Sequence, residues 1–479
     1  MDVTSNTVDA NTLISGYTAT RYDGVTVSGS VPNPEFYDVY KRVVQTGTIT
    51  STISSISYFI ENIPEILDYF FEEVQFIPST YNFSNATTIG IGAFACPLRL
   101  GWTGYSGSII FNFPVCSEIR MYGFYNRNFL TDISCPSCTV IGTSAFQSCY
   151  SLKNINFPIC ESINTYAFNW CSNSNFTNIN FPKCKQIGAY AFQSCSSLNS
   201  ISFPECLSIG ASAFASCKSL TQASFPKCTF IESNAFAYCY NLITANFPVC
   251  STISNHAFYL CESLATISFP QCTTINNSAF YRCSQLSIVS FPQCTTIGNG
   301  AFSYCSALVS VNFPNCTTIG NSTFGSCSAL VSVSLPQCTT IGASAFMNCS
   351  ALVSASLPQC TAISNYAFAY CLSLTTVLMP KCTTVGSSAF YSCVNLNILY
   401  LSDCQTIGSN AFAGCSVLSL YLLGSSVATP SYTVGLYGNF SIYVPASLYD
   451  TYVITQYWST YSTHFVSLTD SEISALSFI

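Results

Sequence analysis

The chain repeats one short phrase of sequence, and the spacing between copies is regular. A phenylalanine that usually follows an alanine, here called the marker phenylalanine, recurs every 22 residues from Phe192 to Phe412 without an insertion. A fixed period of this length is typical of a stack of identical coils, each of which packs on its neighbours. We therefore predict a repeat solenoid whose function lies on a repeated surface or in its unrepeated ends.

Within one coil, the apolar residues fall at constant positions. The segment 308–313 alternates apolar and polar residues and is closed by Pro314, which indicates one short strand per coil in a parallel sheet. Asn321 to Phe324 reads as a short helical or 3₁₀ turn that begins at a capping Asn or Ser. The residues expected to point inward in this coil are Ala301, Phe302, Cys305, Leu308, Val311, Phe313, Cys316 and Ile319.

Composition limits the function classes. Only 7% of the residues are charged and the net charge is −7, so there is no basic surface for nucleic acid. The first residues lack the basic start and apolar run of a signal peptide, and no stretch is long and apolar enough to span a bilayer. We expect no direct membrane insertion, and attachment to any surface through a partner.

The 29 cysteines invite a disulfide or metal interpretation, but 27 of them occupy two repeat positions, three residues after the marker phenylalanine and two residues after the proline position. Equivalent side chains of neighbouring coils are about 4.8 Å apart, which exceeds the Cβ separation of a disulfide. We expect reduced, buried columns of thiols. A zinc site needs clustered ligands, whereas the only histidines are His256 and His464, and the Cys135 to Cys138 C-x-x-C lacks a redox context. We predict no metal and no cofactor.

The repeat resembles the BspA-like leucine-rich repeats, whose pattern runs Leu-x-x-Ile-x-Leu-Pro and then Ile-Gly-x-x-Ala-Phe-x-x-Cys. The resemblance covers about residues 85–420. The chain departs from it by placing Phe at the strand-end Leu position, as at Phe269, Phe291 and Phe313, and by a second Cys after the Pro. The resemblance implies a curved, right-handed leucine-rich-repeat solenoid used in adhesion or recognition, and no catalytic residue.

The unrepeated ends suggest three regions: an N-terminal arm and cap at 1–84, the solenoid at 85–420, and a C-terminal cap at 421–479. Asp23-Gly24 lies between β-rich runs and predicts a hairpin in an arm, residues 11–33, that resembles segments of phage tail and fibre proteins. We expect a helix at 34–46 and another at 61–74 that seals the first coil. A last strand is expected at 440–445 and a helix start at 447–450.

No nucleophile, base and orienting group can be aligned at any spacing, so we do not expect an enzyme. Aromatic residues next to the marker phenylalanine are the candidate binding residues, because Tyr and Trp offer a large contact area with a polar tip. The ordinary explanation is that they shield coil edges or pack against neighbouring subunits in a homo-oligomer. They are Trp170, Tyr238, Tyr259, Tyr281, Tyr304, Tyr370 and Tyr391.

Two functions remain open from the sequence. The first is a non-enzymatic recognition or decoration protein on a phage virion (tail, fibre or head), attached through its N-terminal arm and binding a host surface glycan or protein. The second is a secreted bacterial cell-surface adhesin of the leucine-rich-repeat type, which the family resemblance favours. The missing export signal favours the first.

Overall fold

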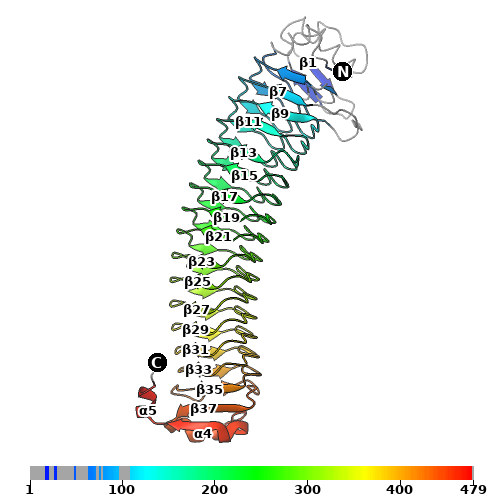
Figure 1. Ribbon diagram of the computed structural model, residues 1–479. Helices are drawn as coiled ribbons and strands as arrows, with labels where there is room; N and C mark the ends of the chain where they lie inside the picture. The colour runs from blue at the N-terminus through cyan, green and yellow to red at the C-terminus, as the bar shows by residue number, and fades with distance from the viewer. Residues whose placement is uncertain are drawn as a thin grey trace. The chain divides into compact units, whose positions relative to one another are not determined.

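A computed structural model describes residues 17–20, 26–29, 48–49, 63–68, 70–71, 75–76, 79–96 and 108–476. The chain forms two compact units, Met1–Phe225 and Pro226–Ile479, which are considered separately. Both units consist of stacked coils joined by parallel strand pairs, so the predicted repeat solenoid is confirmed (Figure 1).

Each regular coil carries two parallel strands, not the single strand expected. A three-residue strand follows the buried leucine, and a two-residue strand lies six residues further on, as in β25 (Ser310–Asn312) and β26 (Thr318–Ile319). β25 pairs with the equivalent strand of the preceding coil, β23 (Ile288–Ser290), and β26 pairs with that of the next coil, so that Thr318 lies opposite Thr340, 22 residues later. The second strand was missed because two residues are too short to show an alternating pattern.

In the second unit, the longer strands are β19 (Thr244–Asn246), β21 (Thr266–Ser268), β23 (Ile288–Ser290), β25, β27 (Ser332–Ser334), β29 (Ser354–Ser356), β31 (Thr376–Leu378), β33 (Ile398–Tyr400), β35 (Val417–Tyr421), β37 (Asn439–Pro445) and β38 (Phe465–Leu468). The shorter strands are β18 (Phe230–Ile231), β20 (Thr252–Ile253), β22 (Thr274–Ile275), β24 (Thr296–Ile297), β26, β28 (Thr340–Ile341), β30 (Ala362–Ile363), β32 (Thr384–Val385), β34 (Thr406–Ile407) and β36 (Thr429–Pro430).

The first unit repeats this arrangement. Its longer strands are β5 (Ser79–Asn82), β7 (Ile109–Asn112), β9 (Leu130–Ser134), β11 (Asn154–Asn156), β13 (Asn178–Asn180), β15 (Ser200–Ser202) and β17 (Gln222–Ser224). The shorter strands are β6 (Thr88–Ile89), β8 (Glu118–Ile119), β10 (Val140–Ile141), β12 (Ser162–Ile163), β14 (Gln186–Ile187) and β16 (Ser208–Ile209). Two further strands, β3 (Thr48–Ile49) and β4 (Gln75–Phe76), pair in parallel.

The segment around the marker phenylalanine is a turn with left-handed residues, not the short helical or 3₁₀ turn expected. Ser322 and Ser326 have φ of 53° and 62°. The N–H groups of Ser322, Phe324 and Ser326 each donate to a carbonyl of the next coil, at 2.8, 2.8 and 2.7 Å. A helix would direct its N–H groups along its own axis, whereas alternating handedness turns every second one toward the neighbouring coil. The turn therefore joins coils as a sheet does.

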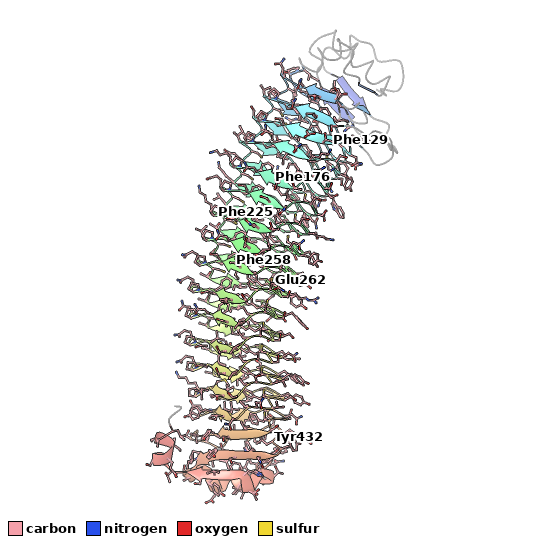
Figure 2. The ribbon with its side chains drawn as sticks, in the orientation of Figure 1. Phe129, Phe176, Phe225, Phe258, Glu262 and Tyr432 are labelled. Atoms are coloured by element: carbon pink, nitrogen blue, oxygen red, sulfur yellow. The ribbon has the colours of Figure 1, made fainter. Side chains whose placement is uncertain are left out.

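The core of each coil is filled by the predicted apolar columns. Phe302 stacks on Phe280 and Phe324, with ring centroids 5.2 and 5.6 Å apart and interplanar angles of 8° and 6°. Burial of each such ring contributes roughly 1.5–3 kcal/mol. Phe258 belongs to the same column, inside the coil, whereas Glu262 extends from its outer edge (Figure 2).

At the start of the first unit, the helix expected at 61–74 is wrong for residues 63–68, 70 and 71, which form turns and a bridge. Ile66 forms an isolated parallel bridge with Ile89, and Phe71 stacks on Phe94 with ring centroids 5.0 Å apart. The spacing from Ile66 to Phe71 is that of the repeat itself, which explains the result. The expected hairpin is confirmed, because β1 (Tyr17–Thr20) and β2 (Thr26–Gly29) pair antiparallel. The turn at Asp23-Gly24 and the helix expected at 34–46 lie outside the described residues.

The C-terminal segments behave as expected for 440–445 and 447–450. β37 is followed by η1 (Ala446–Leu448), α4 (Tyr449–Ile454), η2 (Ser459–His464), β38 and α5 (Asp470–Ser474). Two buried side chains of this region form hydrogen bonds with the backbone of Ala428. The Tyr452 hydroxyl accepts from the Ala428 N–H at 3.0 Å, and Trp458 Nε1 donates to the Ala428 carbonyl at 2.7 Å. None of the helices in the described part of the chain has the length and apolar character of a bilayer-spanning segment.

Candidate functional site

The cysteines lie in the interior, and 27 of the 29 occupy the two positions expected from the repeat. All 29 are buried thiols. In the coil of Phe302, Cys305 donates to the carbonyl of Phe280 at 3.2 Å and Cys316 donates to the carbonyl of Thr318 at 3.3 Å. Burial raises the pKa of both thiols to about 12. The thiolate is the form that attacks electrophiles and binds metals, so these groups are hydrogen-bond donors within the core.

The other residues considered for redox or metal chemistry, Cys135, His256 and His464, pack against neighbouring residues. Cys135 is buried at the inward aromatic position of its coil, and burial raises its pKa well above the ordinary value. His256 has its ring 5.3 Å from that of Tyr259, and His464 stacks on Phe440 at 4.0 Å. Among the described residues, no group of three or more Cys, His, Asp and Glu side chains is arranged to hold a metal ion.

Side chains two residues after the marker phenylalanine point outward. Trp170 in the first unit is 50% exposed, and Tyr238, Tyr304 and Tyr370 in the second are 39%, 49% and 40% exposed. All four have φ of 61° to 63°. Tyr259, Tyr281 and Tyr391, one residue after the marker, are half-buried. The left-handed backbone is costly for these residue types and is held here by hydrogen bonds between coils.

The candidate tyrosines of the second unit gather into two clusters, and Trp170 belongs to the other unit. In the first cluster, the ring of Tyr259 lies 5.6 Å from Tyr238 and stacks on Tyr281 at 5.0 Å, and Tyr281 lies 5.4 Å from Tyr304. Tyr370 and Tyr391, 5.4 Å apart, form the second. Burial, and then the neighbouring phenols, raise the pKa of Tyr281, so its hydroxyl keeps its proton.

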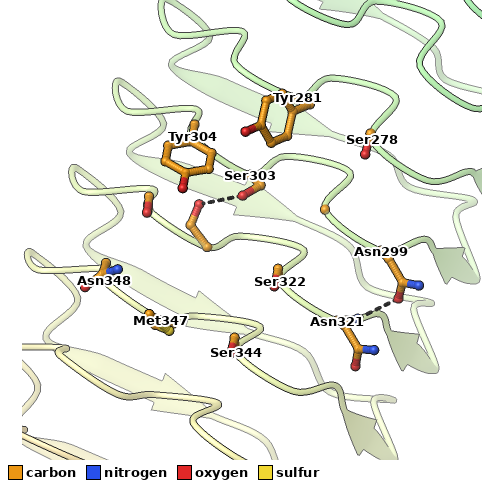
Figure 3. Close-up of a pocket in the computed structure, with 13 residues that line it drawn as sticks. Ser278, Tyr281, Asn299, Ser303, Tyr304, Asn321, Ser322, Ser344, Met347 and Asn348 are labelled. Atoms are coloured by element: carbon orange, nitrogen blue, oxygen red, sulfur yellow. Dashed lines mark hydrogen bonds between the residues drawn. The ribbon is translucent and has the colours of Figure 1, made fainter.

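A groove of about 420 Å³ runs beside the first cluster, over the turns of the coils that contain residues 278–348. Tyr281 and Tyr304 border one side, and Asn299 and Asn321 stand across from them (Figure 3). Two glycines contribute to the hollow, because Gly300 and Gly325 occupy positions that carry larger side chains in other coils. Sequence reasoning found the tyrosines but not the groove.

The asparagines of the groove belong to a column three residues before the marker phenylalanine. The Oδ1 atoms of Asn277, Asn299 and Asn321 each accept from a backbone N–H of the next coil, at 2.8 Å. Because each Oδ1 accepts this hydrogen bond, the orientation of the amide is fixed. The side chains of these asparagines are exposed, so their Nδ2 groups can donate to a ligand. The signal was present in the sequence, as Asn at this position in four consecutive coils from Asn255 to Asn321.

The model of the BspA type leucine rich repeat region, built of six copies, matches residues 117–243, 229–353 and 317–431. These matches cover more than half of the chain, which therefore belongs to the BspA-type leucine-rich-repeat family.

Among curated proteins none matches the chain. Similar solved structures include a leucine-rich repeat protein from Bacteroides ovatus, with 23% identity over 80% of this chain and 88% of that one and a TM-score of 0.42. A leucine rich cell surface protein from Faecalibacterium prausnitzii is 22% identical over 73% and 90% of the two chains, with a TM-score of 0.33. The pneumococcal vaccine antigen PcpA is 16% identical over 81% and 84%, with a TM-score of 0.34.

Proposed function

We propose that the protein is a non-enzymatic recognition protein that binds a surface glycan through the tyrosine-bearing turns of residues 226–479. The observation that carries this proposal is the row of exposed and half-exposed rings from Tyr238 to Tyr304, which touch one another across successive coils. Tyrosine supplies a rigid apolar face and a polar tip at a low cost in conformational entropy. A protein ligand would use the same rings and is the alternative.

The chemistry of the interior supports a binding role over a catalytic one. The chain contains 29 thiols, and those of the regular coils are buried and bound to backbone carbonyls. Their raised pKa values oppose formation of a nucleophile at neutral pH. Recognition by side chains that vary along a constant scaffold is also the common use of repeat solenoids.

The experiment is a glycan array probed with the labelled full chain and with two triple variants. In the first, Tyr238, Tyr304 and Tyr370 are changed to Ala. In the matched control, three exposed serines of the strand face, Ser310, Ser332 and Ser354, are changed to Ala. We expect the tyrosine variant to lose about tenfold or more in affinity and the serine variant to bind as the parent does. Equal binding by both variants, or no glycan bound by the parent, would refute the proposal.

We propose further that the chain is displayed on a phage virion through its N-terminal arm, with display on a bacterial envelope as the alternative that family membership favours. The β1–β2 hairpin supports an arm with its own structure. Deletion of residues 11–33 should abolish incorporation into virions while the urea unfolding curve of the coils stays unchanged. Normal incorporation of the deleted chain would exclude this role for the arm.

A further inference from the structure

We propose that the groove over residues 278–348 binds an uncharged oligosaccharide lying along the stack of coils. This inference rests on the proposed glycan recognition. It adds where the glycan binds, that the glycan is uncharged, and that its chain runs along the stack of coils. The groove crosses four successive coils, whose marker rings are 5.2, 5.6 and 5.4 Å apart. Its long axis therefore follows the stack, and it is longer than a single sugar ring.

The lining offers the two kinds of contact that a sugar chain uses. Tyr304 presents a ring that is 49% exposed at one border, suited to the apolar face of a pyranose. Asn299 and Asn321 repeat the same amide donors one coil apart, each held in place by the Oδ1 hydrogen bond to the next coil. Ser322 and Ser344 add hydroxyls, which both donate and accept. Repeated donors fit a ligand made of repeated units.

The lining of the groove carries no charged side chain, which favours an uncharged ligand. None of the 13 residues around the groove is Asp, Glu, Lys, Arg or His. A carboxylated or sulfated sugar would lose hydration there without meeting a counter-charge. The exposed Arg282 lies near Tyr281, outside the lining, so a charged ligand would meet it only beyond the border of the groove.

The test is calorimetry on the full chain with neutral oligosaccharides of graded length, built from glucose, galactose, mannose or N-acetylglucosamine, and with uronic acid and sulfated counterparts. We expect a neutral chain to bind at least about tenfold more tightly than its monosaccharide and than its acidic counterpart. Raising the salt concentration from about 0.05 to 0.5 M should leave its affinity unchanged.

Two variants with matched controls locate the site. Tyr304→Ala removes the ring beside the groove, whereas Tyr432→Ala removes a tyrosine that is 59% exposed and lies outside it. Asn321→Asp keeps the Oδ1 acceptor for the backbone but removes the amide donors, and Asn365→Asp does the same where Oδ1 accepts from Ser387 outside the groove. We expect about tenfold weaker binding for the first member of each pair and none of this loss for the second.

The outcomes separate this inference from the function on which it rests. Neutral binding that is lost only in the groove variants supports it. If glycans bind but Tyr304→Ala and Asn321→Asp match their controls, or if only acidic glycans bind, this inference is overturned while glycan recognition stands. If neither neutral nor acidic glycans bind, both are overturned.

Discussion

The regular coils and the coil of Phe124 place different side chains at the same position, three residues after the marker phenylalanine. In the regular coils this residue is Cys, and Cys149 donates through sulfur to the carbonyl of Phe124 at 3.1 Å. In the coil of Phe124 it is Arg127, which is 2% exposed and donates through Nε to the carbonyl of Phe94 at 2.6 Å. The fold requires a hydrogen-bond donor here, and it accepts either a weak neutral one or a charged one.

The guanidinium reaches further than a thiol. Its Nη2 donates to the carbonyls of Phe71 and Ala95, at 3.2 and 3.3 Å. In the turns of successive coils, every second N–H group donates to a carbonyl of the following coil, as the N–H of Phe94 does to the carbonyl of Gly123. Aligned peptide dipoles leave partial negative charge at the carbonyl end, where a buried cation is favoured, as at the end of a helix. The comparison indicates that a Cys thiol is a sufficient hydrogen-bond donor within the stack of coils, whereas an Arg guanidinium is favoured near the end of the stack toward which the carbonyls point.

The largest effect that tests this comparison is expected at alkaline pH. Burial raises the pKa of Cys305 and Cys316 from an ordinary value near 9 to about 12. Above pH 9 the unfolded chain therefore binds fewer protons than the folded coils, so the free energy of unfolding falls as pH rises. The loss is about 1.4 kcal/mol per thiol for each pH unit, or about 3 kcal/mol for each pH unit for the two thiols of one coil. Arg127 does not titrate in this range.

Urea unfolding at a series of pH values between about 8 and 11 measures this slope. The double variant Cys305→Ala, Cys316→Ala removes both thiols of one coil and should lower the slope by two protons. An unchanged slope in the double variant would show that the thiols are not the groups responsible.

Replacement of Arg127 should have the next largest effect. Arg127→Ala leaves buried carbonyls without their donor and a space where the guanidinium lay, for a loss of about 3–5 kcal/mol. Arg127→Cys restores the residue of the regular coils and should recover about 1 kcal/mol through a bond to the Phe94 carbonyl, but not the bonds to Phe71 and Ala95.

Urea unfolding together with hydrogen exchange of the amides in residues 79–134 measures these losses. Arg282→Ala, at an exposed site, is the control and should change stability by less than about 0.5 kcal/mol. Equal stability of Arg127→Ala and Arg127→Cys would contradict the shared role of the two residue types.

A smaller effect is expected within the regular column. Cys305→Ala deletes the donor to the Phe280 carbonyl and leaves a small void, at a cost of about 1–2 kcal/mol. Cys305→Ser keeps a donor of similar shape and should lose less. Their unfolding midpoints in urea measure the difference, and a Ser variant less stable than the Ala variant would argue that the thiol acts only as apolar volume.

The sequence predicted the columns better than the surfaces between them. Uninterrupted spacing from Phe192 to Phe412 fixes which residues stack, so the buried Phe, Cys and Leu positions follow from the period alone. The left-handed turn did not follow, because the residues that adopt it include Ser322 and Tyr304, for which this conformation is unusual. Tertiary hydrogen bonds between coils override that local preference. The groove was hidden for a related reason, since it depends on small residues in several coils together.

The smallest expected change in stability concerns the left-handed turn. Substitutions at two equivalent positions of successive coils distinguish the effect of backbone conformation from that of side-chain packing. Gly300 and Ser322 both have positive φ, 60° and 53°, and a Cβ added at Gly300 would meet Ser278 Oγ only at 3.5 Å. Gly300→Ala should therefore cost about 1 kcal/mol through backbone strain alone, and Ser322→Gly should gain a few tenths because relief of strain exceeds the added chain entropy. Urea unfolding would contradict this if both changes had the same sign. If the signs differ as expected, the backbone conformation and its hydrogen bonds between coils stabilise the turn, which explains why the side chain at this position differs from coil to coil, as with Tyr366 and His256.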